Sequence, residues 1–232
     1  MSGRVVMITG AAGNLGRATV RAFEAAGDRL VLIDRSLDAL ARAFGPAGDS
    51  RLYAVVDLLD AQATAGIAKA AAERFGRIDA LCNIAGGFHM GEPVHETSDR
   101  DWNFMMDLNA RTVLNVIRAV VPQMLKQGGG KIVNIGAFAA QRGAAQMGAY
   151  VASKAAVIRL TESMSAELRA SGINVNCVLP TIIDTPENRK SMPDTDPKKW
   201  VAPEDLAGIL EFLCSDRARA IHGAAIPVTG LS

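Results

Sequence analysis

The sequence carries almost no net charge, few cysteines and no long apolar run, and each shortage excludes a class of protein. Lys and Arg total 25 against 24 for Asp and Glu, so no electrostatic field draws the chain to nucleic acid or to an anionic membrane. A small molecule is the expected partner. The apolar run 4–9 gives way to glycines, which makes it too short for a membrane span and unlike a cleaved signal peptide. We therefore expect a cytoplasmic protein.

The three cysteines, Cys82, Cys177 and Cys214, lie far apart in apolar runs. This spacing fits neither a disulfide framework nor a zinc site, and free buried thiols are expected. The three histidines also lack the spacing of metal ligands. We predict no bound metal.

Short β-branched runs alternate with longer Ala-rich amphipathic segments throughout residues 1–232. This alternation predicts an α/β fold, a single domain with a seven-stranded parallel sheet flanked by helices. The expected strands are 4–9, 29–34, 51–56, 78–84, 130–136, 173–179 and 224–229. The expected helices are 14–26, 36–44, 60–75, 99–126, 147–170 and 203–214, with Ser36 and Asp60 as caps. Segment 179–202, rich in proline and charge, is interpreted as a substrate lid, with Trp200 as its anchor or as a pin to the body.

A glycine-rich turn follows the first strand and opens a helix, at Gly10, Gly13, Asn14, Leu15 and Gly16. Glycines there let the backbone approach a pyrophosphate, and the helix N-terminus offers free N–H groups to its charge. The turn therefore predicts a dinucleotide site.

Asp34 ends the second strand, eighteen positions after Gly16. Its carboxylate can accept hydrogen bonds from ribose hydroxyls and would repel a 2′-phosphate, so NAD(H) is favoured over NADP(H). Arg35 keeps NADP(H) as an alternative, since its guanidinium could hold a 2′-phosphate if Asp34 turned away. Asp57 and Leu58 follow the third strand, where Asp57 could meet the adenine or cap the next helix.

Small residues follow the fourth strand at Asn83, Ala85 and Gly86, and they would let the chain pass beneath the cofactor. Phe88 and His89 come next and could border a substrate pocket, because open α/β sheets bind ligands at the carboxyl ends of their strands.

With the glycine turn, Asp34, N83-I-A-G86, Asn109 and Y150-x-x-x-K154, the chain from Val5 to its C-terminal IPVTG resembles the short-chain dehydrogenase/reductase family. The resemblance implies a Rossmann-like doubly wound domain and NAD(P)(H)-dependent oxidoreductase activity. It implies that Tyr150 acts as acid or base toward the substrate. Lys154 would lower the pKa of that phenol and hold the nicotinamide ribose, and Asn109 would anchor a relay water.

The resemblance also implies contacts with the nicotinamide end from the loop after the sixth strand, at Pro180, Ile182, Ile183 and Thr185. Helices near 99–126 and 147–170 have apolar faces larger than a sheet face requires. Together with the resemblance, these faces predict a homotetramer or homodimer.

Ala137 stands where most members of the family carry a catalytic serine. The lost donor would typically cost a few kcal/mol of transition-state stabilisation, and three explanations remain open. In the first, the substrate is a quinonoid dihydropteridine or a similar conjugated compound, because segments 79–88, 136–150 and 184–196 are similar to the dihydropteridine reductase branch. In the second, an ordinary carbonyl or alcohol meets a substitute donor: Gln141, Gln146 or a backbone N–H of 136–138. In the third, the protein is a non-catalytic dinucleotide-binding regulator.

Overall fold

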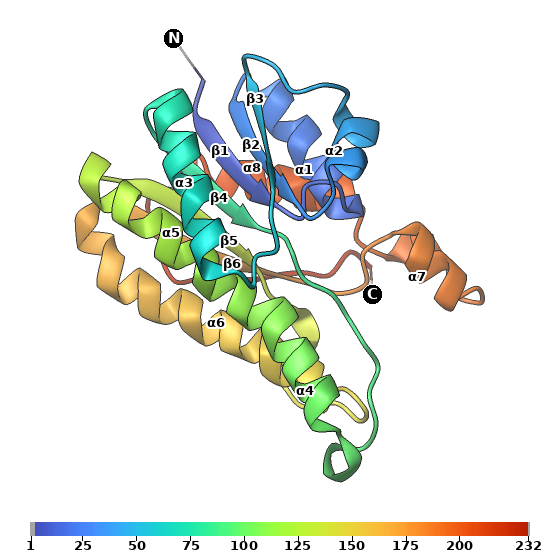
Figure 1. Cartoon of the computed structure of the whole chain (residues 1–232). Coiled ribbons are helices and arrows are strands. Elements are labelled where there is room, and N and C mark those ends of the chain that lie inside the picture. The colour runs from blue at the N-terminus through green and yellow to red at the C-terminus, as the bar shows by residue number, and fades with distance from the viewer. Residues whose placement is uncertain (1–2, 232) are drawn as a thin grey trace.

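A computed structural model describes residues 3–231. Seven strands form one parallel sheet in the order β3-β2-β1-β4-β5-β6-β7 (Figure 1). They are β1 (Val5–Thr9), β2 (Arg29–Asp34), β3 (Arg51–Val55), β4 (Ala80–Asn83), β5 (Gly130–Ile135), β6 (Ile173–Pro180) and β7 (Ala225–Val228). All seven predicted strands are confirmed, as is the flanked parallel sheet.

The helices are α1 (Asn14–Ala25), α2 (Leu37–Phe44), α3 (Ala61–Phe75), α4 (Asp99–Met106), α5 (Thr112–Gln127), α6 (Gly148–Leu168), α7 (Pro186–Ser191) and α8 (Pro203–Leu213). Short helical turns add η1 (Val94–Glu96), η2 (Asp107–Arg111), η3 (Phe138–Gln141), η4 (Arg169–Ser171), η5 (Pro197–Lys199) and η6 (Asp216–Ala218). Ser36 and Asp60 cap α2 and α3 as predicted. No helix among residues 3–231 is long and apolar enough to cross a membrane.

The core consists of two apolar layers, one on each face of the sheet. Alternate residues of one strand point to opposite faces, so Val5 and Met7 pack in one layer while Val6 and Ile8 pack in the other. Helices α3, α5 and α6 cover the first face, and α1, α2 and α8 cover the second (Figure 1). The three cysteines are free and buried.

Two predicted segments differ from the structure. The helix expected over 99–126 is divided into α4 and α5 by the π-helical turn η2, a local widening that apolar periodicity does not reveal. Segment 179–202, expected to be irregular, contains α7, which Thr185 caps by accepting a hydrogen bond from the Asn188 N–H. A parallel bridge between Ile183 and Val201 joins the two ends of this segment.

Candidate active site

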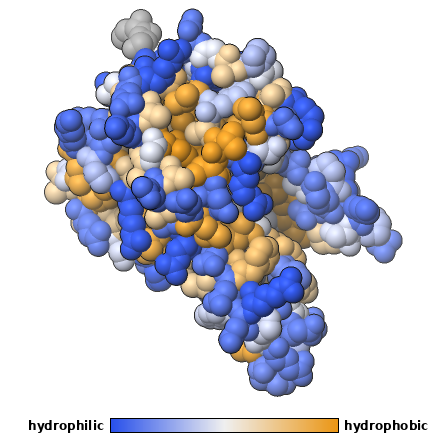
Figure 2. Space-filling model, in the orientation of Figure 1, coloured by the Kyte–Doolittle hydropathy of each residue, from blue (hydrophilic) through white to orange (hydrophobic). Residues whose placement is uncertain are grey.

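A cavity of about 1300 Å³ opens at the carboxyl ends of the strands. It exceeds the roughly 300–1,000 Å³ of an ordinary small-molecule pocket, which leaves room for a dinucleotide and a second molecule. In Figure 2 hydrophobic surface continues into a hollow beside the α7 projection. The lining includes almost all predicted site residues: Gly10, Gly13, Asn14, Leu15, Gly16, Asp34, Arg35, Asp57, Leu58, Ala85, Gly86, Ala137, Tyr150, Lys154, Pro180, Ile182, Ile183 and Thr185.

The glycine turn fits an anionic group by its shape and its free donors. Gly10 has a φ of +64°, and a side chain at Gly16 would begin 2.2 Å from the Gly10 carbonyl oxygen. No side chain caps α1. Within residues 3–231, the backbone N–H groups of Asn14, Leu15 and Gly16 have no hydrogen-bond partner, so they and the helix dipole suit a pyrophosphate.

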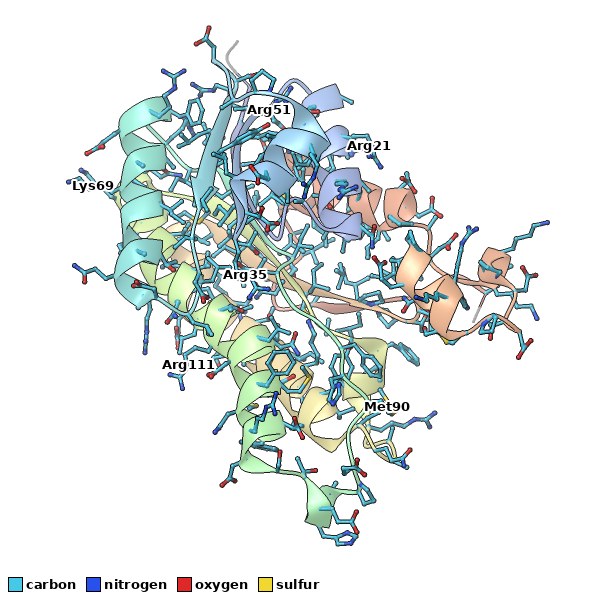
Figure 3. All side chains as sticks on the ribbon, turned by 45° about the vertical axis from the view of Figure 1, so that its right-hand side comes forward. Arg21, Arg35, Arg51, Lys69, Met90 and Arg111 are labelled. Atoms are coloured by element: carbon cyan, nitrogen blue, oxygen red, sulfur yellow. The ribbon has the colours of Figure 1, made fainter. Side chains whose placement is uncertain are left out.

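The carboxylate of Asp34 is fixed beside this turn. One oxygen accepts from the Ala12 N–H at 3.0 Å and the other from the Arg35 N–H at 2.8 Å. Asp34 therefore stays at the cavity edge, where its charge opposes a 2′-phosphate, although Arg35 lines the cavity as well. Figure 3 shows Arg35 well separated from Met90, which lines the substrate end.

Asp57 does not cap the next helix. Its carboxylate accepts from the Leu59 N–H at 3.0 Å, while Asp60 caps α3. The side chain of Asp57 thus braces its own turn at the adenosine end of the cavity.

Asn83 lies in the sheet and is absent from the cavity lining, so its contact with the cofactor stays a prediction. Its amide N–H donates to the Asn134 side-chain oxygen at 2.9 Å, across the β4 and β5 pair. Asn134 in turn donates to Thr161 at 2.9 Å. The side-chain amide of Asn83 thus ties β4 to β5, and Asn134 continues the link to α6.

Asn109 is fully buried in η2 and acts as a clamp. Its side-chain oxygen accepts from the Gly87 N–H at 3.0 Å. Its amide donates to the Gly87 carbonyl at 3.1 Å and to the Ser153 hydroxyl at 3.0 Å. The side chain is occupied by protein partners, so a relay water at Asn109, as the resemblance implies, would have to meet its main-chain carbonyl.

Gly86 passes close to this clamp and to Lys154. A side chain there would begin 2.8 Å from the Asn109 side-chain oxygen and 3.2 Å from Lys154 Nζ. The close approach explains why glycine stands at this position.

Lys154 and Tyr150 both owe their pKa values to burial. Lys154 Nζ donates to the Ile135 carbonyl at 2.9 Å, and burial lowers its pKa to about 8. Burial also raises the pKa of Tyr150 to about 12. The pKa of the phenol is therefore raised, where the resemblance implies a lowered one, and the cause is desolvation by burial. Tyr150 is a neutral O–H donor at physiological pH.

Ala137 is buried and lines the cavity, without a hydroxyl to offer. Neither predicted side-chain substitute reaches the site. Gln141 and Gln146 are exposed and absent from the lining, and Gln146 has a φ of +58°. The Gly136 N–H is used by the Val178 carbonyl at 2.9 Å.

Three residues that help to build the site were not among the predicted ones. Thr9 accepts from the Ile84 and Ala85 N–H groups at 3.0 and 3.1 Å and so holds the loop after β4. Ser153 joins Asn109 to the Tyr150 carbonyl, to which it donates at 2.7 Å. Asn188 lines the cavity from α7 and donates to the Ile183 carbonyl. Thr9 and Ser153 directly precede motif residues, which is the one signal in the sequence that could have found them.

Comparisons with known proteins point to one family. The model of the short chain dehydrogenase family matches residues 4–196. D-threitol dehydrogenase of Mycolicibacterium smegmatis is 33% identical, over 99% of this chain and 93% of that protein. Cis-4-hydroxycyclohexanecarboxylate dehydrogenase of Sinomonas cyclohexanicum is 33% identical, over 98% of this chain and 95% of that protein. NAD+-bound xylitol dehydrogenase has a similar structure, with a TM-score of 0.88 at 27% identity, covering 99% of this chain and 98% of that one.

Proposed function

The chain belongs to the short chain dehydrogenase family and is a nicotinamide-dependent oxidoreductase, and on this premise we propose that it interconverts an uncharged carbonyl compound and its alcohol. One observation carries the proposal. Tyr150 and Lys154 line the same large cavity as the glycine turn and Asp34. A proton donor, a buried cation and a dinucleotide cradle are thus open to one space, which is what coupled hydride and proton transfer requires.

The residues that would hold the cofactor are the uncapped N-terminus of α1, Asp34 at the adenosine ribose and Lys154 at the nicotinamide ribose. When bound, the dinucleotide supplies or takes up the hydride. NAD(H) is the proposed form, because the carboxylate of Asp34 is held at the cavity edge by two backbone N–H groups. Arg35 leaves NADP(H) as the alternative.

Tyr150 would give its phenolic proton to the oxygen of the substrate during reduction, since its high pKa keeps it protonated at neutral pH. In the oxidation direction it would take up the proton of the alcohol, which needs the phenolate form. Lys154, protonated below about pH 8, would stabilise that phenolate. Once Tyr150 has taken up the proton of the alcohol, that proton would leave to solvent through Lys154 and a water at the main-chain carbonyl of Asn109. The resting protonation state therefore favours reduction.

A second candidate substrate is a quinonoid dihydropteridine or a similar electron-poor conjugated compound. It is favoured by Ala137, because such a compound accepts hydride without a second donor to polarise a carbonyl. The small side chain of Ala137 also leaves room along that wall for a flat heterocycle.

We further propose a cytoplasmic homodimer or homotetramer. The free buried thiols suit a reducing compartment. Subunits would meet through α4, α5 and α6, since Trp102 on α4 and Leu125 on α5 are exposed apolar side chains.

The test is NADH consumption with a quinonoid dihydropterin and with a panel of simple ketones. Tyr150→Phe should abolish turnover of every active substrate and leave NADH affinity unchanged. Tyr53→Phe is the matched control, because Tyr53 is the other of the two tyrosines and its hydroxyl donates to the Gly45 carbonyl, away from the cavity. Full activity in Tyr150→Phe would reject the mechanism.

A further inference from the structure

The cavity wall around Tyr150 is built from rings and thioethers. Its members are Phe88, Met90, Phe104, Phe138, Met147 and Met192. They come from the loop after β4, from α4, from the loop after β5 and from the α7 lid, so the chain assembles this wall from four separate segments.

Charged side chains are gathered elsewhere in the lining. Among residues 3–231, those that line the cavity are Asp34, Arg35, Asp57, Asp107 and Lys154. The first three belong to the adenosine end, Asp107 lies 3.6 Å from Arg111, and Lys154 donates to the Ile135 carbonyl. The lid guanidinium of Arg189 is bound by Asp184 at 2.6 and 2.7 Å. With Lys154 engaged at the nicotinamide ribose, as proposed, a charged substrate group beside Tyr150 would lose its hydration without gaining an ion pair.

Phe88 makes the closest ring contact with the proposed proton donor. Its ring meets that of Tyr150 edge to face, with centroids 4.9 Å apart and planes at 87°. Such T-shaped pairs are favoured because the positive edge of one ring faces the negative face of the other. Even so, 56% of Phe88 is exposed, so much of its ring is free to meet a second molecule.

The backbone before Phe88 is held in place. Both the N–H and the carbonyl of Gly87 are bound by the side chain of Asn109, which also binds Ser153 in the same helix as Tyr150. The buried side chain of Asn109 thus fixes both the backbone before Phe88 and the helix that carries Tyr150. An exposed aromatic residue on so rigid a support is suited to contact a ligand.

From this geometry, and resting on the proposed function, we propose that Phe88 positions the phenol of Tyr150 and forms one wall of a slot for an uncharged ring-shaped substrate, such as a cyclic or aryl ketone. A flat ring can stack on the free part of Phe88 and against the neighbouring thioethers, with its carbonyl at the phenolic oxygen. An open chain lacks the face that stacks, and an ionised group has no partner here.

The first experiment compares acetophenone with 2-octanone, two uncharged ketones of equal carbon number. With NADH present, the wild-type protein should bind and reduce the aryl ketone with the higher kcat/KM. Phe88→Leu keeps an apolar side chain but removes the ring, and should reduce this preference by about tenfold, the upper range of an aromatic pair. Phe138→Leu makes the same change at another ring of the cavity lining, one with no ring contact to Tyr150 among residues 3–231, and should keep most of the preference.

Binding is measured separately by saturation-transfer NMR with NADH present, so that the slot can be tested without turnover. Aryl ketone binding that Phe88→Leu loses, without turnover in the wild type, would support the slot and reject the proposed reaction. Equal binding of both ketones, or an aryl preference that Phe88→Leu retains, would overturn the slot.

The positioning of the phenol has its own readout. In a Tyr53→Phe background Tyr150 is the only tyrosine, so NMR of ring-labelled tyrosine follows its titration alone. Phe88→Leu should admit water and shift the Tyr150 pKa from about 12 toward its ordinary value, whereas Phe138→Leu should not. An unchanged titration in Phe88→Leu would exclude a positioning role.

Discussion

Replacing Lys154 with methionine should abolish turnover and yet stabilise the fold, because the ammonium group is buried without a carboxylate partner. Its pKa falls from 10.5 to about 8 on folding, through burial. Each pKa unit corresponds to about 1.36 kcal/mol, so the folded state carries a penalty of about 3 kcal/mol wherever both states hold the proton. Methionine removes that penalty but leaves the Ile135 carbonyl without its donor, which costs about 1 kcal/mol. The expected net gain at pH 7 is about 2 kcal/mol.

The pH dependence gives the sign of the effect. Below pH 8 both states of the wild type hold the proton, and the penalty is complete. Between pH 8 and 10.5 the unfolded chain keeps the proton and the folded chain releases it, so wild-type stability rises with pH. The advantage of Lys154→Met should therefore disappear by pH 10. Tyr150 titrates above this range in the folded state of both proteins and does not change the comparison.

Urea unfolding of both proteins at pH 7 and pH 10, without nucleotide, measures this difference. Lys69→Met is the control, since the Lys69 side chain is 78% exposed and pairs with Glu73 on the surface; its stability should change by less than about 0.5 kcal/mol. If the difference in unfolding free energy between Lys154→Met and wild type is the same at pH 7 and pH 10, the argument that burial sets the pKa of Lys154 is refuted.

Three further outcomes are expected at the site. Asp34→Ala should weaken NADH binding and improve the relative affinity for NADPH, measured by fluorescence titration; a larger loss for NADPH would contradict the role of the carboxylate. Ala137→Ser should raise kcat/KM for simple ketones by about tenfold or more, as an added oxyanion donor does, with Ala137→Gly as the control that adds no hydroxyl. Gly86→Ala should lower activity by at least about tenfold, since its side chain would begin 2.8 Å from Asn109 Oδ1, whereas Gly66→Ala in α3 has open space and should change little.

Much of the architecture is encoded locally and can be predicted from the sequence. Strand alternation, helix periodicity and caps such as Ser36 and Asp60 depend on residues a few positions apart. The glycine turn and the Tyr150 to Lys154 spacing are local patterns too, so most of the cofactor side of the cavity lining can be predicted without the fold. The short helix α7 escaped prediction because it is held by a cap and a lid bridge, without an apolar face of its own.

The environment of each side chain was decided by the tertiary structure. Asn83 and Asn109 both appear in family-like motifs, yet their partners lie far away in the sequence. Asn83 donates to Asn134 on the neighbouring strand, and Asn109 links Gly87 to Ser153. Gln146 is near Tyr150 in the chain but turns out to solvent. The direction of the Tyr150 pKa shift also depends on the tertiary structure. A charge four residues away predicts a lower value, but the packing of β5, α6 and Phe88 sets how much water remains, and desolvation then dominates.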